Sequence, residues 1–200
     1  MSKTLSKGSI TLITIGIVIL ILIGGTLTTY NGLVSKDEAA STAWSNLQAQ
    51  YQRRADLVPN LVNTVKGYAK HESETFESVV AARAKATQLS VDADNLTPER
   101  ARQILQAQGD LSTALGKLMA ISESYPELKA SENFSELQAQ LEGTENRIAE
   151  SRRLYNESVQ TFNTAVRRFP ANIVAGIFGF EKKSKFEAQE SAANAPQVEF

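Results

Sequence analysis

The sequence predicts an all-α protein in which an N-terminal transmembrane helix is followed by an antiparallel helical bundle. One stretch near the N-terminus, residues 8–35, is strongly apolar and contains no charged residue. Beyond it, apolar residues recur at spacings of three and four, as on one face of a helix, and residues 33–169 lack the alternation typical of a strand. The last long segment adds a repeat of seven residues, which is typical of packed helices.

The apolar stretch has the length and composition of a membrane span. Between Ile10 and Leu27, eight residues are Ile or Val and four are Leu. A helix over residues 9–30 is about 33 Å long, which matches the roughly 30 Å hydrocarbon core of a bilayer. We therefore expect Ile10 to Tyr30 to cross the membrane, with Tyr30 at the interface. A cleaved signal peptide fits less well because the run exceeds the usual apolar region of roughly 7–15 residues. A buried core helix fits less well because the run is apolar on every side.

Charge and composition limit the function classes. The chain carries 21 basic and 22 acidic residues, for a formal net charge of −1, and it contains no cysteine. The balanced charge gives no indication of nucleic-acid binding, and the lack of cysteine excludes disulfides and thiol chemistry. Lys3 and Lys7 precede the apolar stretch, whereas only Lys36 follows it closely. The positive-inside rule therefore predicts a cytoplasmic N-terminus and an extracytoplasmic bundle.

Pro59 decides how many helices the bundle contains. Residues 33–57 carry one apolar stripe and residues 58–89 carry a second. Because proline removes a helical hydrogen bond, the chain either turns here, with Asp56 capping a new helix, or only kinks. A turn gives four long segments and returns the last one to the membrane. A kink gives a three-helix version whose last segment ends far from the membrane. The comparable lengths of the segments favour four.

The boundaries of the later helices are clearer in the sequence than the one at Pro59. Residues 90–96 predict a polar connector, Thr97 suits an N-cap and Pro98 suits the first helical position. Pro126 ends this helix, and Pro170 ends the next and last long one. That last helix has a seam of residues seven apart: Phe134, Leu141, Ile148, Tyr155, Phe162 and Phe169.

These elements divide the chain into five expected parts. They are a short N-terminal segment (1–8), the transmembrane helix (9–30), the bundle (31–170), a short apolar and basic segment (171–186) and a flexible C-terminal tail (187–200).

Two groups of residues are candidates for contact with other molecules. Polar residues around and after Pro59 are candidates for docking a partner: Arg53, Arg54, Asp56, Asn60, His71 and Glu72. Surface charge and helix capping would explain the same residues without a partner. Apolar and basic residues after Pro170 are candidates for contact with the membrane surface: Ile173, Ile177, Phe178, Phe180, Lys182, Lys183 and Lys185. The alternative is that the apolar members cap the end of the bundle.

The sequence offers no constellation of catalytic residues. His71 is the only histidine, and Thr75 stands where a zinc-binding His-Glu-x-x-His motif needs a second one. A di-iron bundle also needs two histidines, and a nucleophilic Ser has no base partner other than His71. We expect no catalytic residue, no metal and no cofactor, and therefore no enzyme.

Many positions of the chain match a family pattern. In the first half the matching positions are Tyr30-Asn31, Leu33-Val34, Trp44, Arg53-Arg54, Asp56, Pro59-Asn60-Leu61, Lys66-Gly67-Tyr68, His71-Glu72 and Ala82-Arg83. The match continues through residues 149–169, through Phe178-Gly179-Phe180 and to the Val198-Glu199-Phe200 ending. This pattern resembles the LemA family of bacterial proteins over nearly the whole chain. The resemblance implies one membrane helix followed by a helical-bundle domain, and it implies no particular activity.

We therefore expect a single-pass protein of the bacterial inner (plasma) membrane. Its bundle would act as a non-enzymatic scaffold or adaptor of the cell envelope, with an unidentified protein partner and without nucleic acid. The alternative is a lipid-contacting or membrane-remodelling protein that uses the end of its bundle. A homo-oligomer is also compatible with the sequence.

Overall fold

The computed structural model describes residues 7–89 and 91–187, and over these residues the protein is all-α, as predicted. Residues 1–6, with Lys3, and residues 188–200 of the expected tail lie outside the described residues. The helical elements are α1 (Lys7–Tyr68), α2 (Ser73–Gln88), the 3₁₀ helix η1 (Ala93–Asn95), α3 (Pro98–Ser124), α4 (Pro126–Lys129), α5 (Glu132–Arg167) and α6 (Ala171–Phe178).

A single helix of 62 residues, α1, joins the expected span to the bundle. The predicted turn at Pro59 is wrong, and so is the capping role of Asp56, because both residues lie inside α1. Asp56 instead accepts a hydrogen bond from Gln52 Nε2, one turn earlier, at 2.7 Å. The chain turns between Tyr68 and Ser73.

A side chain of α2 explains why α1 continues through Pro59. Proline has no N–H, so the carbonyl of Ala55, one turn earlier, loses its usual helical donor. Arg83 Nε donates to this carbonyl oxygen at 2.7 Å. Ala55 is buried, so its oxygen would otherwise be left unpaired away from water. Arg83 therefore replaces the hydrogen bond that Pro59 cannot make.

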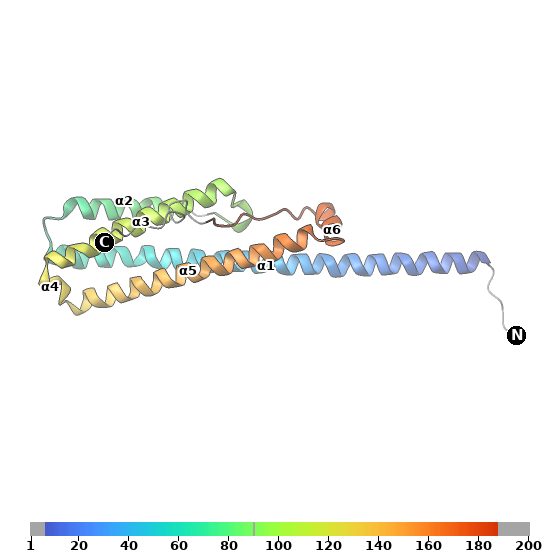
Figure 1. Cartoon of the computed structure of the whole chain (residues 1–200), viewed down its shortest axis with the longest axis horizontal. Coiled ribbons are helices and arrows are strands. Elements are labelled where there is room, and N and C mark those ends of the chain that lie inside the picture. Colours follow the sequence, from blue (N-terminus) through green and yellow to red (C-terminus); the bar gives the residue numbers. More distant parts are fainter. Residues whose placement is uncertain (1–6, 90, 188–200) are drawn as a thin grey trace, which may run out of the picture.

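Four long helices, α1, α2, α3 and α5, pass along the bundle in alternating directions (Figure 1). α1 packs mainly on α5, and α2 packs on α3. Two contacts fix the antiparallel register of α1 and α5. The rings of Trp44 and Tyr155 lie 5.4 Å apart, and Arg54 pairs with Glu145. The end of α5 therefore returns towards the span, as the four-helix version predicted, and the three-helix version is wrong.

The boundaries of α3 and α5 follow their sequence signals. The hydroxyl of Thr97 accepts a hydrogen bond from the N–H of Arg100 at 3.3 Å, as an N-cap does. α5 ends at Arg167, so Phe169 leaves the predicted seam and is 80% exposed. The other seam residues are buried: Phe134, Leu141, Ile148, Tyr155 and Phe162.

Apolar side chains form two large clusters inside the bundle and a small one near the span. The far-end cluster, which includes Leu111 and Phe134, fills the half of the bundle that lies farther from the span. The middle cluster includes Trp44 and Tyr155. The small cluster contains Leu33 and lies at what we call the anchor end, where α1 leaves the bundle.

The first part of α1 projects beyond the bundle (Figure 1). Its large apolar side chains between Ile10 and Leu27 are 49–72% exposed. The hydroxyls of Thr14 and Thr26 donate to carbonyl oxygens one turn earlier, so they need no water as an acceptor. α1 is the one helix of the described residues that is long and apolar enough to cross a membrane.

Candidate functional site: a polar groove beside Arg54

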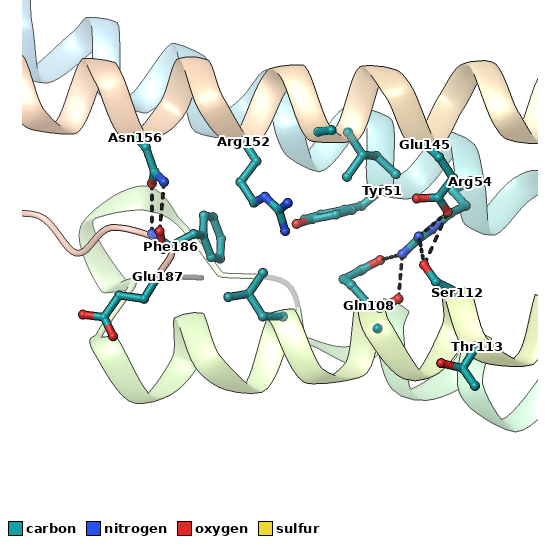
Figure 2. Close-up of a pocket in the computed structure, with 14 residues that line it drawn as sticks. Tyr51, Arg54, Gln108, Ser112, Thr113, Glu145, Arg152, Asn156, Phe186 and Glu187 are labelled. Carbon is teal, nitrogen blue, oxygen red and sulfur yellow. Dashed lines mark hydrogen bonds and ion pairs between the residues drawn. The ribbon is translucent and has the colours of Figure 1, made fainter. Parts of the chain in front are cut away.

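The most polar site inside the bundle surrounds Arg54. Its side chain is 2% exposed, and it extends from α1 towards α3 and α5 (Figure 2). Nη1 donates to Glu145 Oε1 at 2.5 Å and to Ser112 Oγ at 2.7 Å. Nη2 donates to the carbonyl oxygen of Gln108 at 3.1 Å and also to Gln108 Oε1. Arg54 therefore ties α1 to both α3 and α5.

Together Arg54, Gln108, Ser112 and Glu145 form a polar layer that separates the two large apolar clusters. On α1, the middle cluster includes Leu47 and the far-end cluster begins at Val58, with Arg54 between them. A buried charge is costly unless it is paired and hydrogen-bonded. In the observed register Glu145 supplies the countercharge of this guanidinium. The polar layer therefore favours the observed register, even though Nε of Arg54 has no hydrogen-bond partner among the described residues.

Beside the polar layer, a groove of about 650 Å³ opens between α3 and α5. Tyr51 and Arg54 of α1 form its floor, and Arg152 extends into it from α5 (Figure 2). Phe186 and Glu187 line its other end. Glu145 compensates the charge of Arg54, whereas Arg152 forms no ion pair with any residue of the described ranges. Within the described residues, the groove thus presents one cation, Arg152, and one carboxylate, Glu187, that form no ion pair.

Two tyrosines near the groove are neutral hydrogen-bonding groups. Burial raises the pKa of Tyr51 to about 12, although the positive charges of Arg152 and Arg54 act in the opposite direction. Burial also raises the pKa of Tyr155 to about 12, and its hydroxyl donates to the carbonyl oxygen of Ser184 at 2.9 Å. Both phenols therefore stay protonated near neutral pH.

Two asparagines of α5 hold the segment after α6 against the bundle. Asn163 Oδ1 accepts from the N–H of Lys183 at 2.9 Å, and its Nδ2 donates to the Lys183 carbonyl at 2.8 Å. Asn156 makes the same pair of hydrogen bonds to Phe186, both at 2.9 Å. Seven helical residues rise about 10.5 Å, so the three residues from Lys183 to Phe186 span about 3.5 Å each, as in an extended chain. A strand-like segment therefore runs along α5 and enters the groove at Phe186.

Only one of the six predicted partner-contact residues, Arg54, belongs to this site. Arg53, Asp56 and Asn60 are exposed on other parts of α1. The remaining two, His71 and Glu72, lie at the turn between α1 and α2, where Glu72 accepts a hydrogen bond from the Tyr125 hydroxyl at 3.2 Å. The burial of Arg54 accounts for that residue without a partner, and a partner-contact role of the others stays a prediction.

Several residues of the site carry no signal that the sequence analysis used. Gln108, Ser112 and Glu145 resemble the surface residues of any amphipathic helix, so only the fold reveals that they meet Arg54. The asparagines could have been found. Asn156 and Asn163 are seven residues apart and directly follow two seam residues, so they border the packed face of α5.

At the anchor end, α6 lies against the beginning of the bundle. Val174 and Ala175 belong to the same small cluster as Leu33. The ring of Tyr30 lies 4.8 Å from the ring of Phe178 and 5.6 Å from that of Phe180. α6 is therefore held beside the point at which the expected span ends.

The opposite face of α6 is uncovered. On this face Ile173 is 53% exposed and Ile177 is 71% exposed, whereas Phe178, whose ring packs on Tyr30, is 53% exposed. Phe180 is partly buried. Ile173 and Ile177 thus form an exposed apolar face at the anchor end, with the half-exposed Phe178 next to it.

The three predicted lysines differ in their surroundings. Lys182 is exposed. Lys183 Nζ pairs with Asp37 at 2.8 Å and with Asp94 at 2.6 Å, and its side chain is only 8% exposed. Burial lowers the pKa of Lys183, but its hydrogen bonds to the two carboxylates outweigh burial and raise it. Lys183 is therefore a bundle contact, and Lys185 donates to Gln160 Oε1 of α5 at 2.6 Å.

No group of three or more His, Asp or Glu side chains in residues 7–89 and 91–187 is arranged to hold a metal ion. His71 is exposed at the α1–α2 turn.

These features define a class of protein: an all-α chain in which one candidate transmembrane helix continues into a helical bundle. The sequence profile of the LemA family matches residues 43–200, which includes most of the bundle. The chain belongs to the LemA family, and the predicted resemblance is confirmed.

Individual relatives agree with this assignment. The chain is 29% identical over 186 residues to magnetosome protein MamQ of Magnetospirillum gryphiswaldense, and the aligned region covers 84% of this chain and 68% of that protein. It is 26% identical, with the same coverage, to magnetosome protein MamQ 2 of Paramagnetospirillum magneticum. It is also 26% identical over 179 residues to protein LemA of Metamycoplasma hominis, covering 90% of this chain and 76% of that protein.

Proposed function

We propose that this protein is a membrane-anchored, non-enzymatic scaffold or adaptor of the bacterial cell envelope. The observation that carries the proposal is α1, because one helix of 62 residues forms both the candidate span and a wall of the bundle. No linker separates these two parts of α1. The bundle is therefore joined directly to the span by a continuous helix, which suits the presentation of helix faces to a partner.

The chemistry of the groove supports a role in binding. The charge of Arg54 is matched by Glu145, and the pKa values of Tyr51 and Tyr155, raised to about 12, are far from those of useful acids or bases at neutral pH. The proposal fails if the full-length protein turns over a substrate and a folded Glu145→Gln variant does not.

The proposed location is the inner (plasma) membrane, with the bundle outside the cytoplasm. Lys3 and Lys7 flank one side of the span, against Lys36 on the other. We expect protease added to intact spheroplasts to remove the bundle, because the bundle faces the medium. A cytoplasmic protein and a known periplasmic domain serve as controls. Protection of the bundle until the spheroplasts are lysed would place it in the cytoplasm and overturn the proposed orientation.

A second candidate function, contact with lipid, is favoured by the exposed apolar face of α6. Ile173 and Ile177 form this face, next to Phe178, whose ring packs on Tyr30 at the expected membrane interface. A short helix with one apolar face can lie in the interface and bury that face among the headgroups and the upper acyl chains. In this role, α6 would fix the bundle against the bilayer or deform the bilayer locally.

Fluorescence in proteoliposomes tests this second candidate. The chain lacks cysteine, so single Ile177→Cys and Val80→Cys variants of the full-length protein can each carry one environment-sensitive fluorophore. Val80 is the matched control because it is also apolar and exposed, at 54%, but lies on α2. We expect a blue-shifted emission and quenching by spin-labelled lipid at position 177 alone. Equal, water-like emission at both positions would contradict lipid contact by α6.

A further inference from the structure

We propose that the anchor end of the bundle is a docking surface for anionic phospholipids, in which Arg167 and Arg168 bind the headgroups and Phe169 enters the bilayer together with α6. This proposal rests on the second candidate function, contact of α6 with lipid, and names the class of lipid and the residues that select it. Three observations carry it: the level of the two arginines along α1, the exposure of Phe169 and the balance of charge around them.

The packing of α5 on α1 places both arginines at the level of the expected membrane interface. Val166, the residue before Arg167, packs against the small cluster that contains Leu33, and so does Tyr30. Leu33 is 33 − 30 = 3 residues beyond Tyr30, which is about 4.5 Å along the helix axis. Because α5 is antiparallel to α1, Arg167 and Arg168 continue from this level towards the membrane.

The residue that follows the arginines is unusually exposed for its size. Phe169 is 80% exposed, more than any large apolar side chain of the candidate span, where the highest value is 72%. It leads directly into α6, whose exposed apolar face contains Ile173 and Ile177, at the end of the bundle from which the span projects (Figure 1). A contiguous apolar surface of this kind is buried at a bilayer interface, while adjacent basic side chains stay among the headgroups.

The charge at this end of the bundle is positive. Four exposed charged residues at the end of α5 and after α6 form no ion pair within the described residues, namely Arg167, Arg168, Glu181 and Lys182. Their formal sum is 3 − 1 = +2. The next charges sum to 2 − 3 = −1 and begin about 9 Å beyond Tyr30 along α1: Lys36, Asp37, Glu38, Asp94 and Lys183. The edge nearest the bilayer therefore carries the positive charge.

This charge selects the class of lipid. A guanidinium can donate two parallel hydrogen bonds to one phosphate, and every phospholipid offers a phosphate. A zwitterionic headgroup adds an ammonium group, which a surface of net positive charge repels. An anionic headgroup adds no cation, so the anchor end should collect anionic lipid around the span.

Quenching by two spin-labelled lipids, in proteoliposomes of the full-length protein, measures the selectivity. The Ile177→Cys variant carries the fluorophore. The vesicles consist of phosphatidylcholine with a small fraction of spin-labelled phosphatidylglycerol or of spin-labelled phosphatidylcholine. We expect the apparent affinity for the labelled phosphatidylglycerol to be higher by on the order of fivefold, as for one basic residue near an anionic leaflet.

A matched pair of double variants tests the arginines. Arg167→Gln with Arg168→Gln should bring the ratio of the two affinities close to one, because the local charge sum falls to 1 − 1 = 0. The control, Arg147→Gln with Arg153→Gln, removes two exposed arginines of the same helix. Arg153 lies 167 − 153 = 14 residues before Arg167, or about 21 Å. This is about two Debye lengths at 0.1 M salt, so the control should leave the ratio unchanged. The emission of Trp44 in unlabelled protein checks that both variants are folded.

The apolar part of the surface has its own variant. Phe169→Ser should weaken quenching by both lipids and leave their ratio unchanged. Leu154→Ser is the control, because Leu154 is 44% exposed on α5 but lies away from the anchor end. Equal quenching in these two variants would contradict the entry of Phe169 into the bilayer.

The outcomes separate this proposal from lipid contact in general. Quenching that is equal for the two labelled lipids would overturn the selection of anionic lipid and leave contact by α6 standing. Quenching by neither lipid would overturn both. A ratio that survives the loss of Arg167 and Arg168, or that falls equally in the control, would show that these arginines do not select the lipid.

Discussion

Arg54 and Glu145 form an ion pair whose two members differ in their contact with water. The guanidinium is 2% exposed, whereas the carboxylate is 39% exposed. Removing the buried member therefore leaves a carboxylate that water can still reach. Removing the exposed member leaves a buried cation without a countercharge, which is the more costly outcome.

This difference predicts the order of two substitutions. Glu145→Gln should lower the free energy of unfolding by about 2–3 kcal/mol, because Arg54 then stays buried and uncompensated. Arg54→Met should cost only about 1 kcal/mol, since it keeps much of the side-chain volume and removes the charge. Chemical denaturation in detergent, followed by the fluorescence of Trp44, the single tryptophan, measures both values. Glu142→Gln, an exposed neighbour, is the control, and a larger loss for Arg54→Met would contradict the argument.

Tyr51 makes stability depend on pH in the alkaline range. Burial raises the pKa of Tyr51 from its ordinary value of 10 to about 12 in the folded chain, so the protonated phenol favours folding. The stabilisation is complete below pH 10 and is lost as the pH rises towards 12. Tyr51→Phe cannot ionise, so its stability should fall less between pH 9 and pH 11 than that of the parent protein. Denaturation midpoints at the two pH values measure this, and equal falls would show that Tyr51 does not contribute.

At the level of single residues, the sequence predicted only part of the site around Arg54. Arg54 was named among the candidates for docking a partner, but its acceptors are more than fifty positions away in the chain. The periodicity of one helix does not predict which polar residues of another helix its own polar side chains will contact.

Among the elements, α1 departs most from expectation, and Arg83 is the reason. Proline at position 59 was expected to interrupt the helix because the Ala55 carbonyl loses its donor. The donor comes from α2, a separate element, at 2.7 Å. The prediction that Pro59 removes a helical hydrogen bond was therefore correct, but the prediction that the helix turns there was wrong.

A double-mutant cycle tests this explanation. Arg83→Met leaves the buried Ala55 oxygen unpaired and should cost about 1–3 kcal/mol of unfolding free energy. Pro59→Ala restores an N–H one turn after Ala55, so Arg83→Met should cost at least about 1 kcal/mol less in that background. Denaturation of the four proteins under identical conditions gives the coupling energy. Strictly additive costs would show that Arg83 acts independently of Pro59.

Elements with local signals were predicted well. Thr97 and Pro98 begin α3 because capping depends only on neighbouring residues. The seam of α5 is buried through Phe162, and it fails at Phe169 because the helix has already ended at Arg167. A strict repeat of seven in the sequence does not require that the helix reach its last member.

For the whole molecule, the four-pass arrangement was predicted on a mistaken turn position and is still correct. It follows from the number of long segments, and this number does not change when the turn moves from Pro59 to residues 69–72. The groove was not predicted, because it lies between α3 and α5 over side chains of α1 (Figure 2). Such a space depends on the relative placement of three helices.

The unbroken course of α1 makes the bundle a lever arm for the bilayer. The 68 − 30 = 38 residues beyond Tyr30 correspond to about 57 Å of helix. Transmembrane helices change their tilt with bilayer thickness, and a change of about 10° would move the far end of this helix by about 10 Å. The height and reach of the surface that the bundle offers would thus vary with the lipid composition around its span.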